Sequence, residues 1–351
     1  MGLLLCTFLL AFSVSIGLTP YVRKLAFKFD AVARSNHRTI HKGLMPRLGG
    51  VAVFVAFYAG ILLIMLSTGD NFAALRREAM VFLFAGSIIL ALGIYDDIKG
   101  ANSNQKFIVQ LISAIIVVLF GYKITAVVNP FGVPISLGIF SIPFTLLWIV
   151  GITNSINLID GLDGLAAGIS LGAACIMVFI SLWFGNLISA FPAAILAGAI
   201  GGFLIYNFNP ARIFLGDSGS LLIGFLLACF SINGTFRDSS AVAIYIPMVV
   251  LGIPILDTIL AMLRRIRKRI HLFQADKEHI HHKLLQLGIS HRNAVLLLNG
   301  ISYSWGVIAF AIYIFNNPYS FLLLLPVLFT IVLGLKKLGF VKYFLIRIPN
   351  Q

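Results

Sequence analysis

The sequence contains few charged residues, few acids and few cysteines. Only 11% of its 351 residues are charged and 60% are hydrophobic, whereas about a quarter of a typical soluble domain is charged. This shortage of charge excludes an ordinary soluble domain and indicates a protein whose solvent is lipid. The cysteines lie in separate apolar runs without a histidine nearby, which excludes a disulfide framework or a zinc site. We expect them to be small buried residues: Cys6, Cys175 and Cys229.

Apolar runs recur along the whole chain. A helix that crosses a bilayer needs about 20 apolar residues, and about eleven such runs are present. They lie near residues 2–20, 48–67, 79–95, 106–121, 135–152, 163–184, 187–207, 217–235, 241–262, 294–315 and 318–335. The first run lacks a basic lead-in and a small-residue cleavage site, so it is predicted to span the membrane and not to be a removed signal peptide. The sequence therefore predicts an all-α polytopic membrane protein with one domain over residues 1–351.

Lysine and arginine are distributed unequally among the loops between these runs. All of the 26 basic residues except Arg76, Arg77, Lys123 and Arg237 fall in one alternating set of loops. Because basic loops stay in the cytoplasm, we expect the N-terminus outside, the C-terminus inside and a site on the cytoplasmic face of the plasma (inner) membrane. The set comprises the tail after residue 335 and the loops near 21–47, 96–106, 153–162, 208–216 and 263–293.

The net charge of +14 has two explanations that the sequence leaves open. Cytoplasmic basic residues are attracted to anionic lipid headgroups, and direct attraction of an anionic substrate would favour the same charge. No basic region is interleaved with aromatic residues in the way that suggests nucleic-acid binding. A nucleic-acid partner is therefore not expected.

Most acids and all seven histidines lie on the same expected side of the membrane. Only Asp70, Glu78 and Asp238 of the 12 acids fall elsewhere. A transporter for anionic solutes, the rival class, would place ionisable groups near mid-span at broken helices. Acids and histidines at helix ends and in loops instead favour an enzyme whose site faces the cytosol.

Two adjacent acids, Asp96 and Asp97, end the third apolar run. Like charges this close repel each other unless a cation or a shared proton intervenes. Hard carboxylate oxygens suit Mg²⁺, which also binds substrate phosphates. The pair predicts a magnesium-dependent phosphate site, and its simpler alternative is a solvated pair at a helix end.

The segment from Asn154 to Gly168 combines amides, carboxylates and glycines beside two membrane spans. If it is helical, Asn157, Asp160 and Asp163 follow one another at i, i+3 and form a polar stripe. A turn with one capping acid is the alternative. The Asp-Gly-Leu-Asp-Gly run is superficially similar to a lipid phosphotransferase signature, but residues 165–185 lack the arginine and further aspartates of that signature.

Asp217 and Ser218 precede another apolar helix in the segment 207–220. These residues are typical of a helix cap, and a helix N-terminus equally favours a bound phosphate. A last cluster of polar residues follows in the loop near 263–293, where a basic run begins at Arg264 and three histidines follow: His279, His281 and His282. Zinc is the rival ligand for the histidines, but no cysteine completes a familiar ligand spacing, so donors to a pyrophosphate are preferred.

Together these blocks resemble the polyprenyl-phosphate N-acetylhexosamine-1-phosphate transferases, glycosyltransferase family 4. The likeness covers nearly the whole chain and includes residues 41–50, which look like the first cytoplasmic loop of that family. It implies that Asp96 and Asp97 are the catalytic pair. It also implies that Asp217 and Asn157 hold Mg²⁺, for which Mn²⁺ is an expected substitute.

The same resemblance implies two substrate sites. Asp160 and Asp163 would line the nucleotide-sugar pocket, where Asp163 could accept the uracil N3–H. Lys106 would meet the lipid phosphate. The other implied contacts with substrate are Asn154, Arg264, His279, His281 and His282.

The implied reaction moves N-acetylglucosamine-1-phosphate, or a related N-acetylhexosamine-1-phosphate, from a UDP-sugar to undecaprenyl phosphate and releases UMP. It would begin a cell-envelope polysaccharide such as lipopolysaccharide or teichoic acid. Residues 274–282 look more like the N-acetylglucosamine branch than the phospho-N-acetylmuramoyl-pentapeptide transferases, which stay the alternative, and residues 31–44 depart from the family pattern. Direct attack by the lipid phosphate, a covalent aspartyl-phosphate route and a homodimer are all left open.

Overall fold

The computed structural model describes residues 1–33, 44–67, 73–128, 134–233, 245–270, 278–315 and 319–340. Most of these residues are helical, so the all-α expectation is confirmed. The α-helices are α1 Gly2–Lys28, α2 Gly49–Ser67, α3 Ala73–Lys99, α4 Ser103–Leu119, α5 Ser141–Ile159, α6 Leu165–Trp183, α7 Leu187–Asn207, α8 Gly216–Asn233, α9 Tyr245–Val250, α10 Gly252–Arg267, α11 Ile280–Gln286, α12 His291–Phe315 and α13 Leu324–Lys337.

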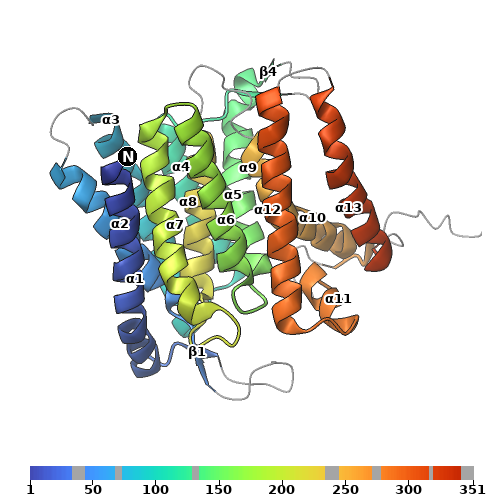
Figure 1. The fold of residues 1–351 in the computed structure, drawn as a ribbon. Helices are drawn as coiled ribbons and strands as arrows, with labels where there is room; N and C mark the ends of the chain where they lie inside the picture. Colours follow the sequence, from blue (N-terminus) through green and yellow to red (C-terminus); the bar gives the residue numbers. More distant parts are fainter. Residues whose placement is uncertain are drawn as a thin grey trace, which may run out of the picture.

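The long helices run side by side across the molecule (Figure 1). Helices α1 and α2 form one edge, α12 and α13 form the other, and α11 lies at the lower end beneath α12. Two short antiparallel hairpins lie at opposite ends, with β1 (Val32–Ala33) and β2 (Met45–Pro46) below and β3 (Ala126–Val128) and β4 (Pro134–Ser136) above. Two 3₁₀-helices, η2 Gly138–Phe140 and η3 Ser320–Leu323, lead into α5 and α13.

Helix α8 occupies the centre of the bundle. Its residues from Leu221 to Cys229 are all buried, and it packs against α2, α3 and α5. A helix that is apolar on every side is stable only when other helices surround it. The first turn of this central helix carries Asp217, one of the predicted site residues.

Small residues allow α1 and α7 to approach closely. A Cβ atom at Gly198 would lie 2.4 Å from the carbonyl oxygen of Phe8, and one at Gly202 would lie 2.4 Å from that of Phe12. Ser15 donates a hydrogen bond of 2.7 Å to the carbonyl of Ala199 across the same interface. In lipid, such close packing and interhelical hydrogen bonds drive helix association, because apolar surface alone gives no advantage over contact with lipid tails.

Within the described residues, seven helices are long and apolar enough to cross a membrane. Each of the apolar runs in the sequence contains a helix, but the remaining runs form shorter or interrupted helices: α4, α8, α9 with α10, and η3 with α13. The chain is therefore a membrane protein with several spans.

The run expected as one span at residues 241–262 is broken between α9 and α10. Pro254 has no N–H, so it cannot bond the carbonyl of Val250 one turn earlier. The hydroxyl of Ser302 on α12 donates to that carbonyl instead, at 2.6 Å. A neighbouring helix thus satisfies the group that the proline leaves open, as a break at membrane depth requires.

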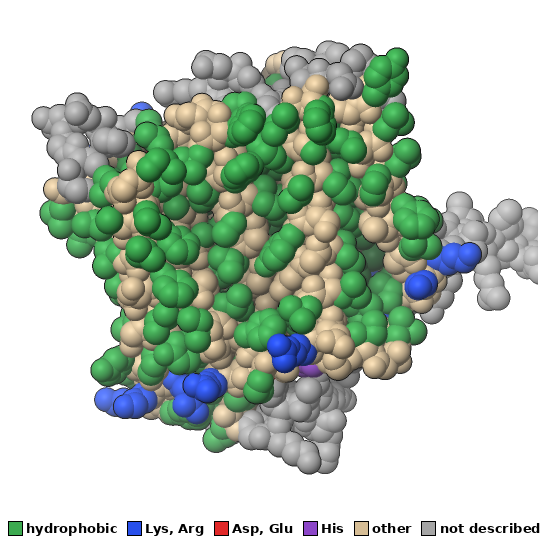
Figure 2. All heavy atoms as spheres, in the orientation of Figure 1, with side chains coloured by type: hydrophobic (Ala, Val, Ile, Leu, Met, Phe, Trp, Pro, Cys, Tyr) green, Lys and Arg blue, Asp and Glu red, His purple; other side chains and the backbone are tan. Residues whose placement is uncertain are grey.

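The face drawn in Figure 2 is hydrophobic over its middle, and lysine and arginine side chains gather near its lower edge. This pattern suits a protein surrounded by lipid whose basic end meets the headgroups. The expectation that the cysteines are buried is right for Cys229 and wrong for Cys6 and Cys175, which are exposed. Lipid does not drive a small apolar side chain inward as water does.

Candidate active site

Asp96 and Lys106 are brought together by the tight connection between α3 and α4. Gly100 adopts a positive φ of 78° after the end of α3, and the Asn102 side chain caps α4 by accepting from the backbone N–H of Gln105 at 2.8 Å. The turn places Lys106 Nζ 2.8 Å from Asp96 Oδ2, while Asp96 Oδ1 accepts from the Ala101 N–H at 2.6 Å. A glycine that ends one helix and a capping residue that begins the next are local features of the sequence, so the sequence itself favours this turn.

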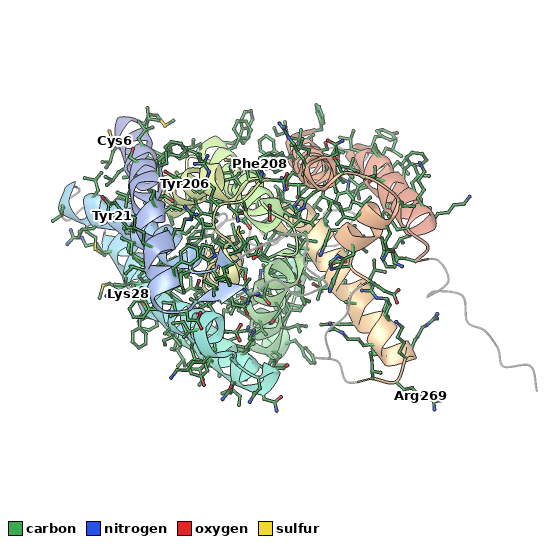
Figure 3. All side chains as sticks on the ribbon, turned by 90° about the horizontal axis from the view of Figure 1, so that it is seen from below. Cys6, Tyr21, Lys28, Tyr206, Phe208 and Arg269 are labelled. Atoms are coloured by element: carbon green, nitrogen blue, oxygen red, sulfur yellow. The ribbon has the colours of Figure 1, made fainter. Side chains whose placement is uncertain are left out.

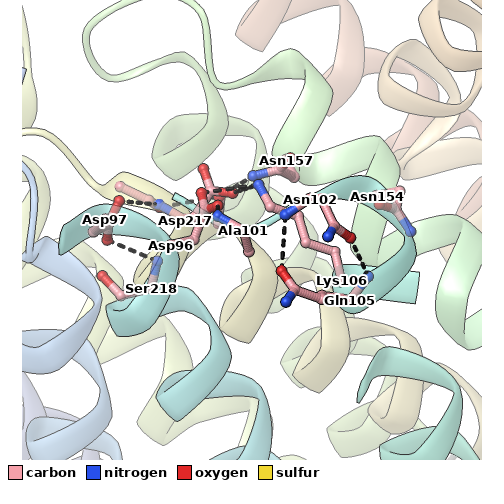
Figure 4. Close-up of polar contacts among 12 residues, drawn as sticks. Asp96, Asp97, Ala101, Asn102, Gln105, Lys106, Asn154, Asn157, Asp217 and Ser218 are labelled. Atoms are coloured by element: carbon pink, nitrogen blue, oxygen red, sulfur yellow. Dashed lines mark hydrogen bonds and ion pairs between the residues drawn. The ribbon is translucent and has the colours of Figure 1, made fainter. Parts of the chain in front are cut away.

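The same lysine reaches the first turn of α8. Its Nζ lies 2.5 Å from Asp217 Oδ2, so one ammonium bridges two carboxylates from different helices (Figure 4). All three side chains are between 15% and 25% exposed, so solvent and substrate can reach them. The ammonium can attract a phosphate group, and the carboxylates can bind a metal ion that in turn holds phosphates.

Asp97 faces away from this lysine and caps α8. Its Oδ1 accepts from the Asp217 N–H at 2.9 Å and its Oδ2 accepts from the Ser218 N–H at 3.0 Å (Figure 4). The close contact needs glycine at position 93, because a Cβ there would lie 2.3 Å from Ser218 Cα. The structure therefore separates the predicted pair: Asp96 joins the partly exposed cluster with Lys106, and the buried Asp97 anchors the helix that carries Asp217.

Asn157 lies beside α8 with a defined side-chain contact. Its Nδ2 donates to Ser220 Oγ at 2.9 Å, and Ser220 Oγ donates to the carbonyl of Gly216 at 3.0 Å. With the amide nitrogen used in this way, the amide oxygen is the atom available to a cation.

The candidate metal ligands are hard oxygen donors. The part of the chain that the structure describes contains no group of three or more His, Cys, Asp or Glu side chains in metal-binding geometry. Mg²⁺ does not need such a group, since it commonly takes one or two carboxylates and completes its shell with water and substrate phosphates. Asp217 and the Asn157 oxygen fit that requirement.

Two predicted substrate residues make contacts within the protein. The Asn154 amide donates to Gln110 Oε1 at 2.6 Å. Asp163 Oδ2 accepts from Asn209 Nδ2 and from the Ala211 N–H, both at 3.1 Å. Asp163 therefore ties the turn after α5 to the segment before α8, and its proposed contact with uracil stays a prediction.

The turn that follows α5 is packed against α11. A Cβ atom at Gly161 would lie 2.1 Å from His281 Nε2, so only glycine permits this contact. Burial, followed by the charges of Asp217 and Asp97, raises the pKa of Asp160 to about 8. The electrostatic coupling of Asp160 to those two acids indicates that the turn belongs to the same site.

The histidine segment is anchored by a residue to which the sequence analysis gave no role. Asp257 on α10 has no exposed surface, and its Oδ2 lies 2.7 Å from His279 Nδ1. Its Oδ1 accepts from the Ile280 N–H at 2.8 Å. An acid inside an apolar run is itself a signal of function in a membrane protein, and this signal could have identified Asp257.

Arg264 lies deeper than a simple phosphate contact would require. It is 1% exposed, and its guanidinium lies over the ring of Phe340, with 5.3 Å from Cζ to the ring centroid. Viewed from the lower end, α10 extends sideways from the bundle with Arg269 at its tip (Figure 3). Direct contact of Arg264 with substrate stays a prediction.

Much of the polar sequence expected in loops is helical. Asp96, Lys106, Asn154 and Asn157 lie near the ends of α3, α4 and α5. Helix ends hold these side chains more rigidly than loops would, which suits a site that aligns reactants. Residues 34–43 and 271–277, which include His41 and Asp276, lie outside the described residues.

Comparison with known proteins finds one matching family model and several relatives with related names. A family model described as glycosyl transferase family 4 matches residues 79–235. A Bacillus subtilis (strain 168) protein named "Probable undecaprenyl-phosphate N-acetylglucosaminyl 1-phosphate transferase" is 39% identical over 83% of this chain and 80% of its own length. A Mycolicibacterium smegmatis "Decaprenyl-phosphate N-acetylglucosaminephosphotransferase" is 37% identical over 86% and 79%. An Escherichia coli (strain K12) "Undecaprenyl-phosphate alpha-N-acetylglucosaminyl 1-phosphate transferase" is 28% identical over 79% and 75%.

The chain therefore belongs to glycosyl transferase family 4, a class of membrane enzymes that transfer a glycosyl phosphate. The resemblance inferred from the motifs is confirmed. Within the family, the chain falls in the branch of the polyprenyl-phosphate N-acetylglucosamine-1-phosphate transferases.

Proposed function

We propose that this enzyme transfers N-acetylglucosamine-1-phosphate from its UDP-sugar to undecaprenyl phosphate, which gives a lipid-diphosphate-sugar and UMP. The contact that carries the proposal is the bridge from Lys106 to Asp96 and Asp217, because it joins three helices at one charged, partly exposed point. The relatives act on undecaprenyl or decaprenyl phosphate by their names, which supports this acceptor.

We assign the following catalytic steps to the residues of the chain. An oxygen of the lipid phosphate attacks the phosphorus that carries the sugar, and the phosphoanhydride bond to UMP breaks. Asp96 positions the attacking phosphate and accepts its proton if that phosphate is protonated, while Lys106 stabilises its negative charge. The bond from the sugar carbon to oxygen is untouched, so the anomeric configuration is retained. Catalysis rests on alignment and charge stabilisation, as in other phosphoryl transfers.

Magnesium is part of the proposal. Asp217 and Asn157 would hold the ion, which when bound neutralises charge on the donor pyrophosphate. Asp97 contributes indirectly, because its two hydrogen bonds to the first turn of α8 fix the backbone of Asp217. Removal of the metal with EDTA should abolish turnover, and Mg²⁺ or Mn²⁺ should restore it.

The proposed topology has eleven spans, an outside N-terminus and a site on the cytoplasmic face of the plasma membrane, where the product would begin a cell-envelope polysaccharide. It is supported by the basic residues near the lower end in Figure 2. Because Cys6 and Cys175 are exposed, the three native cysteines are first replaced by serine. Single cysteines introduced into that background at Lys28 and at Lys123 should then differ in labelling by a membrane-impermeant thiol reagent applied to intact cells, with only position 123 labelled. Labelling of both positions, or of position 28 alone, would contradict this orientation.

The decisive experiment is reconstitution. Purified protein in lipid nanodiscs is given Mg²⁺, undecaprenyl phosphate and one of several donors, including UDP-N-acetylglucosamine and UDP-N-acetylmuramoyl-pentapeptide, and UMP is measured. We expect UMP only with the lipid acceptor and most rapidly with UDP-N-acetylglucosamine. Preference for the muramoyl donor would move the enzyme to the alternative branch, and absence of UMP with every donor would refute the proposal.

A further inference from the structure

Asp257 connects two consecutive helices, α10 and α11, across the segment between them. It lies on α10, and both of its carboxylate oxygens meet the start of α11, through His279 Nδ1 at 2.7 Å and the Ile280 N–H at 2.8 Å. Asp257 has no exposed surface, and His279 is 6% exposed. A buried carboxylate is costly unless its partners compensate it, so these two contacts are specific features of the site.

The pair defines where the imidazole of His279 carries its proton. An ionised carboxylate only accepts hydrogen bonds, so the proton between the two side chains belongs to His279 Nδ1. That leaves Nε2 as the one ring nitrogen that can meet a ligand. A carboxylate hydrogen-bonded to Nδ1 also favours a positively charged ring over a neutral one, and in a charged ring Nε2 carries a hydrogen that can be donated.

The ring of His279 also contacts the next histidine of the site, His281. The rings of His279 and His281 are nearly parallel, with 5.6 Å between centroids and 5° between planes. His281 in turn presses on Gly161, next to Asp160. Asp257 therefore holds a stack of side chains that ends at the turn carrying the proposed nucleotide-sugar contacts.

We infer that Asp257 is a positioning residue of the transferase, which holds His279 as a positively charged Nε2–H donor to a phosphate oxygen of the nucleotide sugar. This inference rests on the proposed function, because the ligand it names is the donor of that reaction. Asp257 itself touches no substrate and acts through His279.

The substitution Asp257→Asn removes the negative charge of the carboxylate and keeps the size of the side chain. The asparagine oxygen can still accept from the Ile280 N–H, and its amide nitrogen can donate to His279 Nδ1, so both contacts and the side-chain shape are kept. In this variant we expect the ring of His279 to be neutral, with its one N–H at Nε2. We expect kcat for UMP release to fall by about 10- to 100-fold, the same range as for carboxylates that orient metal-binding histidines, with little change in KM or in the thermal unfolding midpoint.

Thr258→Val is the matched control. Thr258 neighbours Asp257 on α10 and is buried, and among the described residues its hydroxyl donates to the Pro254 carbonyl of the same helix, at 2.9 Å. We expect turnover in this variant within about 2-fold of the wild type, since isolated losses of a local hydrogen bond act mainly on stability. An Asp257→Asn variant that is as active as Thr258→Val would overturn the inference.

A double-mutant cycle tests whether Asp257 acts through His279. If it does, Asp257→Asn combined with His279→Gln should be no slower than His279→Gln alone, because residues that act as a unit are not additive. Multiplication of the two single effects would overturn the inference.

A spectroscopic readout separates this inference from the proposed function. In protein labelled with ¹⁵N-histidine, the signals of His279 can be assigned by their loss in His279→Gln. We expect a protonated Nδ1 in the wild type and an unprotonated Nδ1 in Asp257→Asn. Unchanged signals would refute the Asp257–His279 relationship even if the wild type releases UMP, and a wild type without UMP release would refute the function while the signals still report on the pair.

Discussion

The ammonium of Lys106 lies 2.5 Å from a carboxylate oxygen of Asp217, although 111 residues separate them in the chain. The contact joins α4 to the first turn of the central helix α8. Lys106 also bonds Asp96, so its removal would leave two carboxylates facing each other without a counter-charge.

Replacing Lys106 by Met should therefore reduce turnover by at least about 100-fold. The longer arginine at this position keeps the positive charge, so Lys106→Arg should keep part of the activity. UMP release in nanodiscs measures both variants. Near-normal activity of Lys106→Met would show that neither the lipid phosphate nor the two acids depend on this ammonium.

The two adjacent acids should respond differently to the same substitution. Asp97→Asn leaves one oxygen for two N–H donors on α8, so it should lower the free energy of unfolding by about 1 kcal/mol, as for the loss of a helix cap. Asp96→Asn loses one partly exposed contact with Lys106, so it should cost less stability than Asp97→Asn, but it should lower kcat by about 100-fold or more. Circular dichroism melting in detergent and UMP release give the comparison. Unchanged stability of Asp97→Asn together with complete loss of turnover would instead place Asp97 among the groups that touch substrate or metal.

Gly161 and Gly151 provide a matched pair of glycine substitutions around α5. Gly161→Ala brings a Cβ to 2.1 Å from His281 Nε2, whereas the Cβ of Gly151→Ala meets nothing within 4 Å. We expect Gly161→Ala to cost about 1–3 kcal/mol by overpacking and to raise the KM for the UDP-sugar. Gly151→Ala should be neutral or stabilising by up to about 1 kcal/mol, since alanine favours a helix interior. Equal behaviour of the two variants would show that α11 does not pack on this turn.

The stability of the protein should depend on pH through His281. Burial, and then the neighbouring His282, lowers the pKa of His281 to about 3, whereas an unfolded histidine titrates near 6.5. Between these two values the unfolded state binds the extra proton, so stability falls as the pH falls through this window, by up to about 1.4 kcal/mol per pH unit.

His281→Gln cannot take up that proton. Melting temperatures measured between pH 7.5 and 5 should therefore decline less steeply for this variant than for the wild type. The other histidines are common to both proteins, so the difference in slope belongs to His281. Parallel slopes would mean that His281 is not buried in the folded protein.

Individual residues show how far sequence reasoning reached. Asp96, Asn157 and Asp217 were singled out from polar segments beside apolar runs, and Lys106 was added by the family resemblance. The structure brings Lys106 to both Asp96 and Asp217. Their proposed roles in catalysis and binding stay predictions. Asp257 was counted with the cytoplasmic acids but given no role, because its partner His279 is 22 residues away across a basic run and no local pattern connects them.

The amino-acid sequence alone determined that the chain crosses a membrane and that it belongs to a family of glycosyl-phosphate transferases, and it predicted that the polar residues collect on one face of the membrane. Hydropathy, loop charge and motif order are linear properties, so they can be read without coordinates. Only the tertiary structure decided that Asp96 turns to Lys106 while Asp97 caps α8. Neighbouring side chains on a helix point about 100° apart, and which direction meets a lysine or a helix end depends on the helices packed around them.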